Sequence, residues 1–536
     1  MPLTKKVIIC LITTFVSFSF FSGCILDEWF GGTTFTLNSW TICDDKGFAG
    51  LNITFSCSDF INVELIGPDS LLYDSDFFFK GDYTTIFHLA EFRHSVKPGQ
   101  YILKSYDNDF NEIFTQSFSF EGIDLTISSC DQIWWKQDPF TGGDSLLGLG
   151  MIVNNNGDTP AYPYNIIVTM DSKENTSFVL PSVILPYESK HVNCFIYRNN
   201  TPINDIFIVC LKDIDENTLG DNSFTVNAED NVLVKQYSWQ YKCNHRINIP
   251  KPETLHSYYI NLDRIRSEDY SLYIFDPYDD QYIDILIDCI MFGFSGSSDL
   301  EKINYIASFV QNLEYKSDSE TNSSYEYPRY PVETLFNGNG GGDCEDKAIL
   351  TASLLYNLGY DVALLRLPNH MAVGVNLSEI ANPNYKYYTD SYYFLETTTA
   401  FKPCGFIPDE YEEFKSEVIV YPISSRPLII HNWENNSLTI FTNTEIGDFV
   451  KVTMIVQNLG ITTAKNIKVV GGFYTINGLK EISKNNIIPS LEPGMKKEVT
   501  ISVDIPKYVK TLFKTRVYID NEIVDEKESI SLFPTI

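Results

Sequence analysis

The stretch GNGGGDCEDKAILTASLLYNLGY, from Gly338 to Tyr360, decides how the middle of the chain folds. A run of glycines precedes a cysteine held between acidic residues, and an apolar pattern with helical spacing follows. Asp343 is a suitable N-cap residue. The pattern therefore predicts a helix that begins at Cys344 and runs to Leu358, with Gly359 as its C-terminal stop.

The position of Cys344 suits a nucleophile. A thiol at a helix N-terminus faces unpaired backbone N–H groups and the positive end of the helix dipole, which predicts a lowered pKa and a thiolate. The same N–H groups suit an oxyanion formed after attack on a carbonyl. Gly338 and Gly340–Gly342 would let a substrate backbone approach closely. Asp346 and Lys347 are expected to be surface or helix-end charges without a catalytic role.

A nucleophilic cysteine needs a base, and the base needs a group that orients it. His370 opens a predicted strand that runs to Val375, and Glu396 lies on a later predicted strand. A hairpin that turns near Asp390 would bring Glu396 close to His370. Asp390, at the tip of that turn, is the rival for the third position.

The run from Tyr327 to Leu377, with the later segment YYFLETT, resembles the transglutaminase-like superfamily of papain-related cysteine enzymes. The family pattern is Gly-x-Cys at the head of a helix, His-Ala-x-Val on a strand and an acidic residue on the next strand. Here Cys344, His370 and Glu396 occupy these places in the same order. The resemblance implies that Cys344 is the nucleophile, His370 the general base and then acid, and Glu396 the orienting carboxylate.

Two features depart from the family pattern. The third member is usually aspartate, whereas Glu396 stands here, followed by the Thr-Thr that the pattern places after its acidic residue; Asp390 stays open as the alternative. The gap between histidine and acid is also longer than is common, which an added hairpin explains. A tyrosine among Tyr325, Tyr327 and Tyr330 is a candidate to complete the oxyanion site.

Three other interpretations of this motif compete with a nucleophile. Cys344 as half of a disulfide would leave an odd number of other mature cysteines. Zinc held by Cys344, His370 and Glu396 would have suitable ligand types, but the sequence lacks Cys-x-x-Cys or His-x-x-x-His spacing. The third interpretation is a related protein that keeps the geometry of this site but only binds its ligand. We predict no metal and no cofactor.

Two blocks of sequence repeat on either side of this segment. LLGLGMIVNNNGDTPAYPYNIIVTM is matched far downstream by FVKVTMIVQNLGITTAKNIKVVGGFY, and a turn with Leu and Pro follows each block. Both blocks resemble CARDB-like immunoglobulin-type modules, which implies β-sandwiches over 123–236 and 426–536. Alternating strands with Pro-Gly turns predict another β-sandwich over 33–122.

The predicted fold class is therefore multidomain, with three β-sandwich modules and one α+β domain of transglutaminase-like, papain-like type. The α+β domain covers 237–425, where helical spacing replaces strand alternation. Within it, Ser298 followed by Glu301 three residues later predicts the start of another helix through a capping box.

Length and charge exclude some partners. A chain of 536 residues, 44% hydrophobic and 14% aromatic, has enough apolar material for several folded domains. Its formal net charge of −31 disfavours binding to nucleic acid, because phosphate recognition needs basic patches.

The N-terminus predicts export. Two lysines precede an apolar run and small residues, the order of a secretory signal over 1–23. Phe21-Ser22-Gly23-Cys24 resembles a lipoprotein cleavage box, which implies that Cys24 carries lipid and that 24–32 form a tether. An uncleaved anchor helix is the alternative. Both interpretations predict a membrane-anchored protein on the cell surface.

The cysteines are predicted to form disulfides. The chain has 11 cysteines, and an even number remains after Cys10, Cys24 and Cys344 are set aside. The local pairs predicted are Cys43–Cys57, Cys194–Cys210 and Cys243–Cys289, although sequence cannot fix the connectivity.

Together these features predict a cell-surface cysteine enzyme that transfers acyl groups from amide or peptide bonds. Hydrolysis, as in a peptidase or amidase, is favoured over transamidation. The substrate would be a protein or peptide amide, and the sandwich modules would bind surface protein or glycan. The alternative is an adhesion or scaffolding protein whose transglutaminase-like domain only binds.

Overall fold

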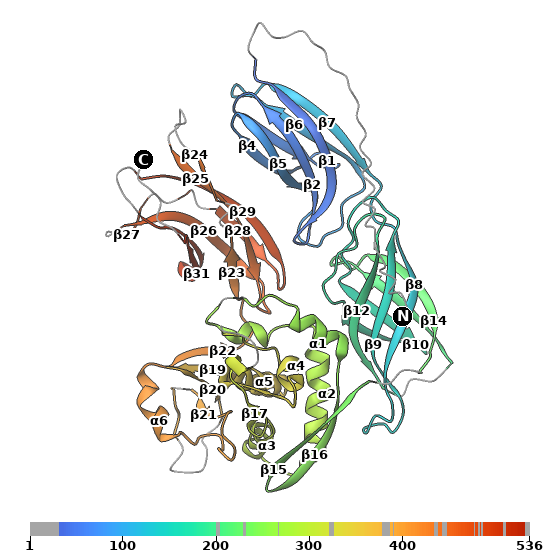
Figure 1. Cartoon of the computed structure of the whole chain (residues 1–536), viewed down its shortest axis with the longest axis vertical. Coiled ribbons are helices and arrows are strands. Elements are labelled where there is room, and N and C mark those ends of the chain that lie inside the picture. The colour runs from blue at the N-terminus through green and yellow to red at the C-terminus, as the bar shows by residue number, and fades with distance from the viewer. Residues whose placement is uncertain are drawn as a thin grey trace, which may run out of the picture. The chain divides into compact units, whose positions relative to one another are not determined.

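Strands dominate the computed structural model, and they form several small separate sheets (Figure 1). The structure describes residues 32–199, 204–228, 232–265, 267–320, 326–377, 386–389, 391–433, 438–441, 448–475, 478–480, 483, 486–506 and 511–530. Predicted signal, tether and lipidation at Cys24 lie outside these ranges. Within them, no helix combines the length and the apolar character that a membrane crossing requires.

The chain divides into two compact units, and the first is built from residues up to Ile123 with two short loop segments. Two antiparallel sheets, β1-β2-β5 and β4-β3-β6-β7, make up this unit. Buried and less buried residues alternate along β3 and β6, as expected for strands with one face in a core. The strands are β1 (Phe35–Asp45), β2 (Phe48–Cys57), β3 (Ile61–Ile66), β4 (Leu72–Phe78), β5 (Gly81–His88), β6 (Gly99–Tyr106) and β7 (Glu112–Phe120).

The second unit begins with another pair of antiparallel sheets, β12-β9-β8 and β11-β10-β13-β14. This arrangement is consistent with the β-sandwich predicted for this segment. Its strands are β8 (Leu125–Trp135), β9 (Ser145–Asn155), β10 (Asn165–Met170), β11 (Lys173–Phe178), β12 (Ser189–Arg198), β13 (Ile206–Lys212) and β14 (Thr218–Thr225).

Helices and a small sheet occupy the middle of the second unit. The hairpin β15 (Val234–Tyr241) and β16 (Cys243–Pro250) leads into the helices α1 (Glu253–Ile260), α2 (Asp280–Met291), α3 (Asp299–Gln311), α4 (Pro331–Phe336), α5 (Cys344–Asn357) and α6 (Asp409–Glu412). Short 3₁₀ helices lie at η1 (Tyr270–Tyr273), η2 (Asp318–Glu320) and η3 (Glu413–Ser416). The antiparallel sheet has the order β21-β20-β19-β22, with β19 (Val362–Leu367), β20 (His370–Val375), β21 (Tyr393–Leu395) and β22 (Ile419–Ile423).

Helix α3 begins as the sequence predicts. Ser298 is its N-cap, and the Ser298 side chain accepts a hydrogen bond from the Glu301 backbone N–H at 3.2 Å. The Glu301 carboxylate reaches back to the N–H of Ser297 at 3.1 Å. The predicted capping arrangement is confirmed, with the return bond shifted by one residue.

One apolar core runs from the preceding sandwich into the helices. Trp135 of β8, Leu147 of β9 and Phe195 of β12 belong to the same buried cluster as the inner faces of α2, α3 and α5. Polar contacts reinforce this packing, because Gln281 of α2 accepts from the Tyr197 N–H at 3.2 Å. α1 and α2 therefore pack directly against β12.

The last segment of the second unit again has two sheets around one apolar core. Buried residues of β25, β26, β29 and β30 fill the space between the sheets. Its strands are β23 (Ile429–Asn432), β24 (Leu438–Phe441), β25 (Phe449–Asn458), β26 (Ala464–Thr475), β27 (Gly478–Lys480), β28 (Asn486–Leu491), β29 (Lys496–Asp504), β30 (Phe513–Ile519) and β31 (Glu522–Glu528).

The sequence repeat has a structural counterpart in two buried asparagines. Asn155 ends β9 and donates from Nδ2 to the Ile184 carbonyl at 3.0 Å. Asn458 ends β25 and donates from Nδ2 to the Leu491 carbonyl at 2.9 Å. Ile184 and Leu491 each stand two residues before a proline. In both modules, therefore, the shared spacing joins a strand end to the Pro-containing turn.

The predicted disulfides are wrong: all nine described cysteines are free thiols. Cys43 lies opposite Gly50 in the β1–β2 ladder, whereas Cys57 lies at the far end of β2, about 23 Å away at 3.3 Å per residue. Cys194 and Cys210 belong to different sheets. The even number of remaining cysteines suggested disulfides, but it does not say which strands bring two sulfur atoms close together.

We expect Asn458→Ala to destabilise the last segment by about 2 kcal/mol. The substitution removes buried hydrogen bonds and leaves the buried backbone partners of Asn458 without them. Asn458 also accepts from the N–H groups of Gly460 at 3.0 Å and Leu428 at 3.2 Å. Amide hydrogen exchange of β25 and β29 in the full chain measures the change. The neighbouring Gln457→Ala should change the opening free energy by less than about 0.5 kcal/mol, and equal effects of the two variants would contradict the assignment.

Candidate active site

Two glycines just before α5 lie where there is no space for a side chain. β18 (Gly341–Gly342) pairs in parallel with β17 (Glu314–Tyr315). Gly341 has a φ of +141°, and a Cβ there would lie 2.1 Å from the Glu314 carbonyl oxygen. A Cβ on Gly342 would lie 2.1 Å from a carboxylate oxygen of Asp346. These glycines are required by the protein's own packing, which the sequence interpretation of substrate access did not anticipate.

Cys344 is the first residue of α5, as predicted, but its surroundings are acidic. Its thiol donates to Glu345 Oε2, with 3.2 Å between sulfur and oxygen. Burial, and then the charge and hydrogen bond of Glu345, raise the pKa of Cys344. A hydrogen bond from the backbone N–H of Met371 lowers it only in part. The predicted lowering of the pKa is therefore wrong, because burial and a neighbouring carboxylate outweigh the helix dipole.

The contact with Met371 also locates the thiol relative to β20, since Met371 directly follows His370. α5 packs against β20 and β19. The structure therefore brings Cys344 to the beginning of the strand that His370 opens, although the two residues are 26 positions apart in sequence.

His370 and Glu396 form a buried pair. His370 Nε2 lies 3.0 Å from Glu396 Oε2, and the two residues are 9% and 1% exposed. Burial raises the pKa of Glu396, but the bonds from His370 and Thr398 lower it overall. Thr398 donates from its backbone N–H to Glu396 Oε1 at 2.7 Å. With Nε2 held by Glu396, Nδ1 is the ring nitrogen left to exchange a proton with a thiol.

Neighbouring elements hold this pair in place. Gln311, the last residue of α3, donates from Nε2 to the Glu396 carbonyl at 2.8 Å and to the Lys402 carbonyl at 2.7 Å. Tyr411 of α6 stacks on the imidazole of His370, with ring centroids 4.4 Å apart and an interplanar angle of 3°. The histidine is therefore held at its edge by a carboxylate and on its face by a phenol ring.

Two charges that were expected on the surface are buried. Asp346 accepts from the Arg329 N–H at 2.7 Å and forms an ion pair with the Arg329 guanidinium. Lys347 donates from Nζ to the Leu313 carbonyl at 2.9 Å, and burial lowers the pKa of Lys347 to about 8. Both residues are 0% exposed. The expectation of helix-end surface charges is wrong, because this turn of α5 enters the core and its charges find buried partners.

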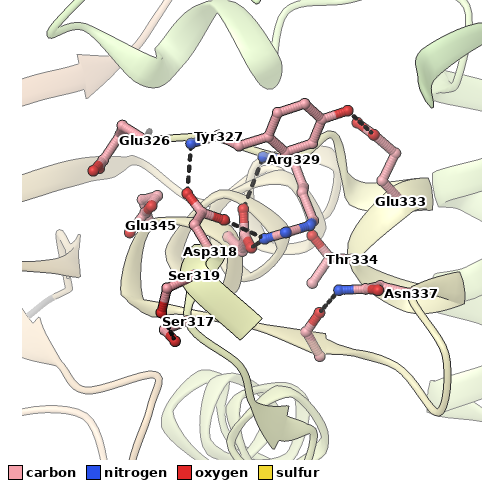
Figure 2. A network of polar contacts seen from close by, with 12 residues as sticks. Ser317, Asp318, Ser319, Glu326, Tyr327, Arg329, Glu333, Thr334, Asn337 and Glu345 are labelled. Carbon is pink, nitrogen blue, oxygen red and sulfur yellow. Dashed lines mark hydrogen bonds and ion pairs between the residues drawn. The ribbon is translucent and has the colours of Figure 1, made fainter. Parts of the chain in front are cut away.

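Arg329 joins the first turn of α5 to the preceding segment, and Figure 2 shows its contact with Asp318. The guanidinium of Arg329 contacts Asp318 at 3.0 Å as well as Asp346. Tyr327 donates from its hydroxyl to Glu333 at 3.1 Å, and Glu333 in turn accepts from the Tyr330 N–H at 3.0 Å. These contacts fix the segment before α4 against the N-terminus of α5.

The other candidates from the sequence are placed as follows. Tyr327 is engaged with Glu333, and Tyr330 stacks on Tyr259 at 4.3 Å in a buried aromatic cluster. Tyr325 and Asp390 lie outside the described residues.

Carboxylates able to hold a cation lie beside the thiol. One ligand oxygen each from Asp318, Asp343 and Glu345 lies within 4.8 Å of the others. Among the described residues, Cys344, His370 and Glu396 do not converge in this way, so the zinc alternative receives no support from the geometry.

Sequence analysis missed three neighbours of the thiol and imidazole. Glu345 touches the sulfur, and Tyr411 covers the histidine. Tyr315 of β17 is close enough for the charge of Cys344 to act with burial in raising the pKa of Tyr315 to about 12. Glu345 was visible as the residue after the cysteine, whereas no local pattern marks Tyr315 or Tyr411.

Comparisons with known proteins leave the family open. No family model matches the chain, and no curated protein matches it. Solved structures with some likeness include a red sea bream transglutaminase, at 10% identity and TM-score 0.18 over 71% of this chain and 79% of that one. The BSP domain of a biofilm-associated protein has 10% identity and TM-score 0.12, covering 94% and 96%. An Amycolatopsis orientalis exo-chitosanase has 9% identity and TM-score 0.14, covering 90% and 76%. Likenesses this low carry no argument about function.

We expect Arg329→Met to destabilise the site by about 3–5 kcal/mol, because it leaves the buried Asp346 carboxylate without its cation. Hydrogen exchange of α5 in the full chain measures this loss. Arg366→Met is the matched control: Arg366 pairs with Glu268, whose side chain is 72% exposed, so a change below about 1 kcal/mol is expected. The double variant Arg329→Met/Asp346→Leu should recover part of the lost stability. If these variants destabilise α5 no more than Arg366→Met does, Arg329 does not anchor the first turn of α5.

Proposed function

We propose that this chain is a thiol-dependent enzyme that cleaves amide bonds, and that 237–425 form its α+β catalytic domain of transglutaminase-like type. The observation that supports this most is the buried His370–Glu396 pair, 3.0 Å apart, at the strand end next to the Cys344 thiol. Cys344, His370 and Glu396 are the proposed nucleophile, base and orienting carboxylate.

The chemistry follows from which atoms are engaged. His370 Nδ1 takes the thiol proton as the sulfur attacks the substrate carbonyl, so that a C–S bond forms and the carbonyl oxygen becomes an oxyanion. Glu396 stabilises the resulting imidazolium through Nε2. The imidazolium then protonates the leaving amine, the C–N bond breaks and a thioester remains. Water, deprotonated by His370, attacks the thioester and releases the acid and the free thiol.

The resting site supports general-base catalysis more than a preformed thiolate. The Cys344 thiol donates its hydrogen bond to Glu345, and burial together with this carboxylate raises the pKa of Cys344, which favours a protonated thiol before substrate arrives. His370 is held at one ring nitrogen by Glu396 and on its face by the ring of Tyr411. A base that is held in position suits a proton transfer that occurs only during attack.

The location and partners are proposed from the sequence. Export through a signal over 1–23, lipid at Cys24 and a cell-surface position belong to this proposal, with a protein or peptide amide as the substrate. The sandwich modules would serve as spacers or as binding surfaces for surface protein or glycan.

An electrophilic amide probe tests the catalytic assignment. We expect it to label Cys344, Cys344→Ala to abolish that labelling, and His370→Ala to slow it by at least about 100-fold through loss of the base. Glu396→Gln should slow it less, because histidine remains but loses its orienting charge. Labelling is measured by mass spectrometry of the intact chain and its peptides.

Cys243 provides an internal control, because it is an exposed free thiol in the same chain. Its labelling rate should not change in His370→Ala. If the labelling rate of Cys344 is indifferent to His370→Ala, the catalytic proposal fails. A protein whose transglutaminase-like domain only binds would then be the better account, in line with the protonated resting thiol.

A further inference from the structure

A second cysteine and histidine lie together at the turn of the β15–β16 hairpin, outside the candidate active site. Cys243, the first residue of β16, is an exposed free thiol. Its sulfur lies 3.3 Å from Nε2 of His245, two residues further along the same strand. Residues at this spacing share one face of a strand. The thiol is therefore not isolated, because an imidazole nitrogen lies within hydrogen-bond distance of it.

The contacts of this imidazole indicate which of its nitrogens carries the proton. His245 Nε2 lies 2.9 Å from the Tyr241 carbonyl oxygen, which can only accept a hydrogen bond. His245 Nδ1 lies 3.1 Å from the hydroxyl of Tyr305 on α3. Burial, and then the charge of Cys243, raise the pKa of Tyr305 to about 12, so this hydroxyl keeps its proton at neutral pH and can donate to Nδ1. The pattern assigns the proton to Nε2, the nitrogen beside the Cys243 sulfur.

Aromatic rings hold the imidazole in this orientation. The ring of Trp239 on β15 stacks on His245, with centroids 5.0 Å apart and an interplanar angle of 28°. Tyr305 meets the imidazole edge-on, at a centroid distance of 4.9 Å. Trp239 and Tyr305 are buried in the apolar core of the second unit. The hydrogen-bond donor beside Cys243 is therefore fixed by the core, whereas Cys243 itself is exposed.

We propose that Cys243 is a thiol–disulfide exchange site that captures low-molecular-weight disulfides as mixed disulfides, with His245 as its positioning residue. The thiolate is the attacking form of a cysteine, and it accepts a hydrogen bond more strongly than the neutral thiol does. The Nε2–H of His245 therefore favours the reacting form of the sulfur. Exchange needs an accessible thiolate and a leaving sulfur, and it needs no oxyanion site. An exposed thiol beside a fixed donor meets these needs.

The exchange balances without a further reactant. Cys243 gives its proton to water, and its sulfur attacks one sulfur of the disulfide, so that a new S–S bond forms as the original one breaks. The leaving thiolate takes up a proton and departs as a small thiol. The thiol of Cys289 also contacts β16, but at the Asn248 carbonyl, about 17 Å along the strand from Cys243 at 3.3 Å per residue. Cys289 therefore cannot displace the captured group, and the mixed disulfide persists.

Exchange with the neutral probe hydroxyethyl disulfide tests this assignment in the full chain. A neutral probe is not repelled by a protein whose formal net charge is −31. The Cys344→Ala background removes the proposed catalytic thiol, so the result does not depend on the proposed function. We expect one half of the probe to be added to Cys243, and Cys243→Ser to abolish this addition. Peptide mass spectrometry over time measures the rate at each cysteine.

Variants of His245 test its positioning role. His245→Leu should slow exchange at Cys243 by about tenfold or more, because the thiolate loses a hydrogen-bond donor. His245→Gln should restore much of the rate, since its side-chain amide offers an N–H in place of Nε2. The matched control is His191→Leu, which removes an exposed histidine of β12 and should leave the rate unchanged.

Amide hydrogen exchange of β15 and β16 reports whether each variant keeps the hairpin. If His245→Leu keeps the hairpin and exchanges as fast as the parent, or if Cys243 stays unmodified in the parent, the proposal is overturned. If His245→Leu loses the hairpin, the parent chain decides alone. Cys243 should then react about tenfold faster or more in the folded chain than in urea, where no donor is held beside the sulfur. Equal rates in the two states would also overturn the proposal.

Discussion

The buried ion pair between Arg329 and Asp346 is the contact on which the candidate site depends. Asp346 lies in the first turn of α5, two residues after Cys344, so whatever fixes Asp346 also fixes the thiol. Arg329 holds Asp346 through both its backbone N–H and its guanidinium. A buried pair of this kind adds little net stability compared with apolar packing, but removing one partner is costly. Its value here is therefore positional: it sets where α5 begins.

The histidine and its carboxylate are held by other elements. Gln311 binds the Glu396 carbonyl from the end of α3, and Lys347 binds the Leu313 carbonyl just beyond that end. The end of α3 thus contacts both the helix that carries the thiol and the strand end that carries the acid. A displacement of α3 would move the two halves of the site together, whereas a displacement of η2 would act on the cysteine side alone.

The sequence predicted the elements better than their environment. The helix starting at Cys344, the strand opened by His370 and the capping residue Ser298 follow from local periodicity and caps, which depend on neighbouring residues only. Asp346 and Lys347 were misjudged because local pattern treats a charge as exposed unless a partner is visible. The partners come from Arg329 and from the end of α3, which the sequence does not place. The thiol pKa failed for the same reason, since burial is a tertiary property.

The continuous core limits how the second unit can rearrange. Phe195 of β12 packs edge-on against Tyr282 of α2 at 5.6 Å, and Tyr282 donates to the Pro250 carbonyl at 3.0 Å. α2, which packs against α5, thus shares one apolar cluster with β12. Rearranging this packing would expose large aromatic side chains. Each exposed side chain would cost about 2 kcal/mol or more, because its apolar surface would no longer be buried. The thiol face is bounded by the half-exposed Tyr315 and by Tyr411 and carries no comparable cost. Under the proposed function, a substrate would therefore be accommodated at that face.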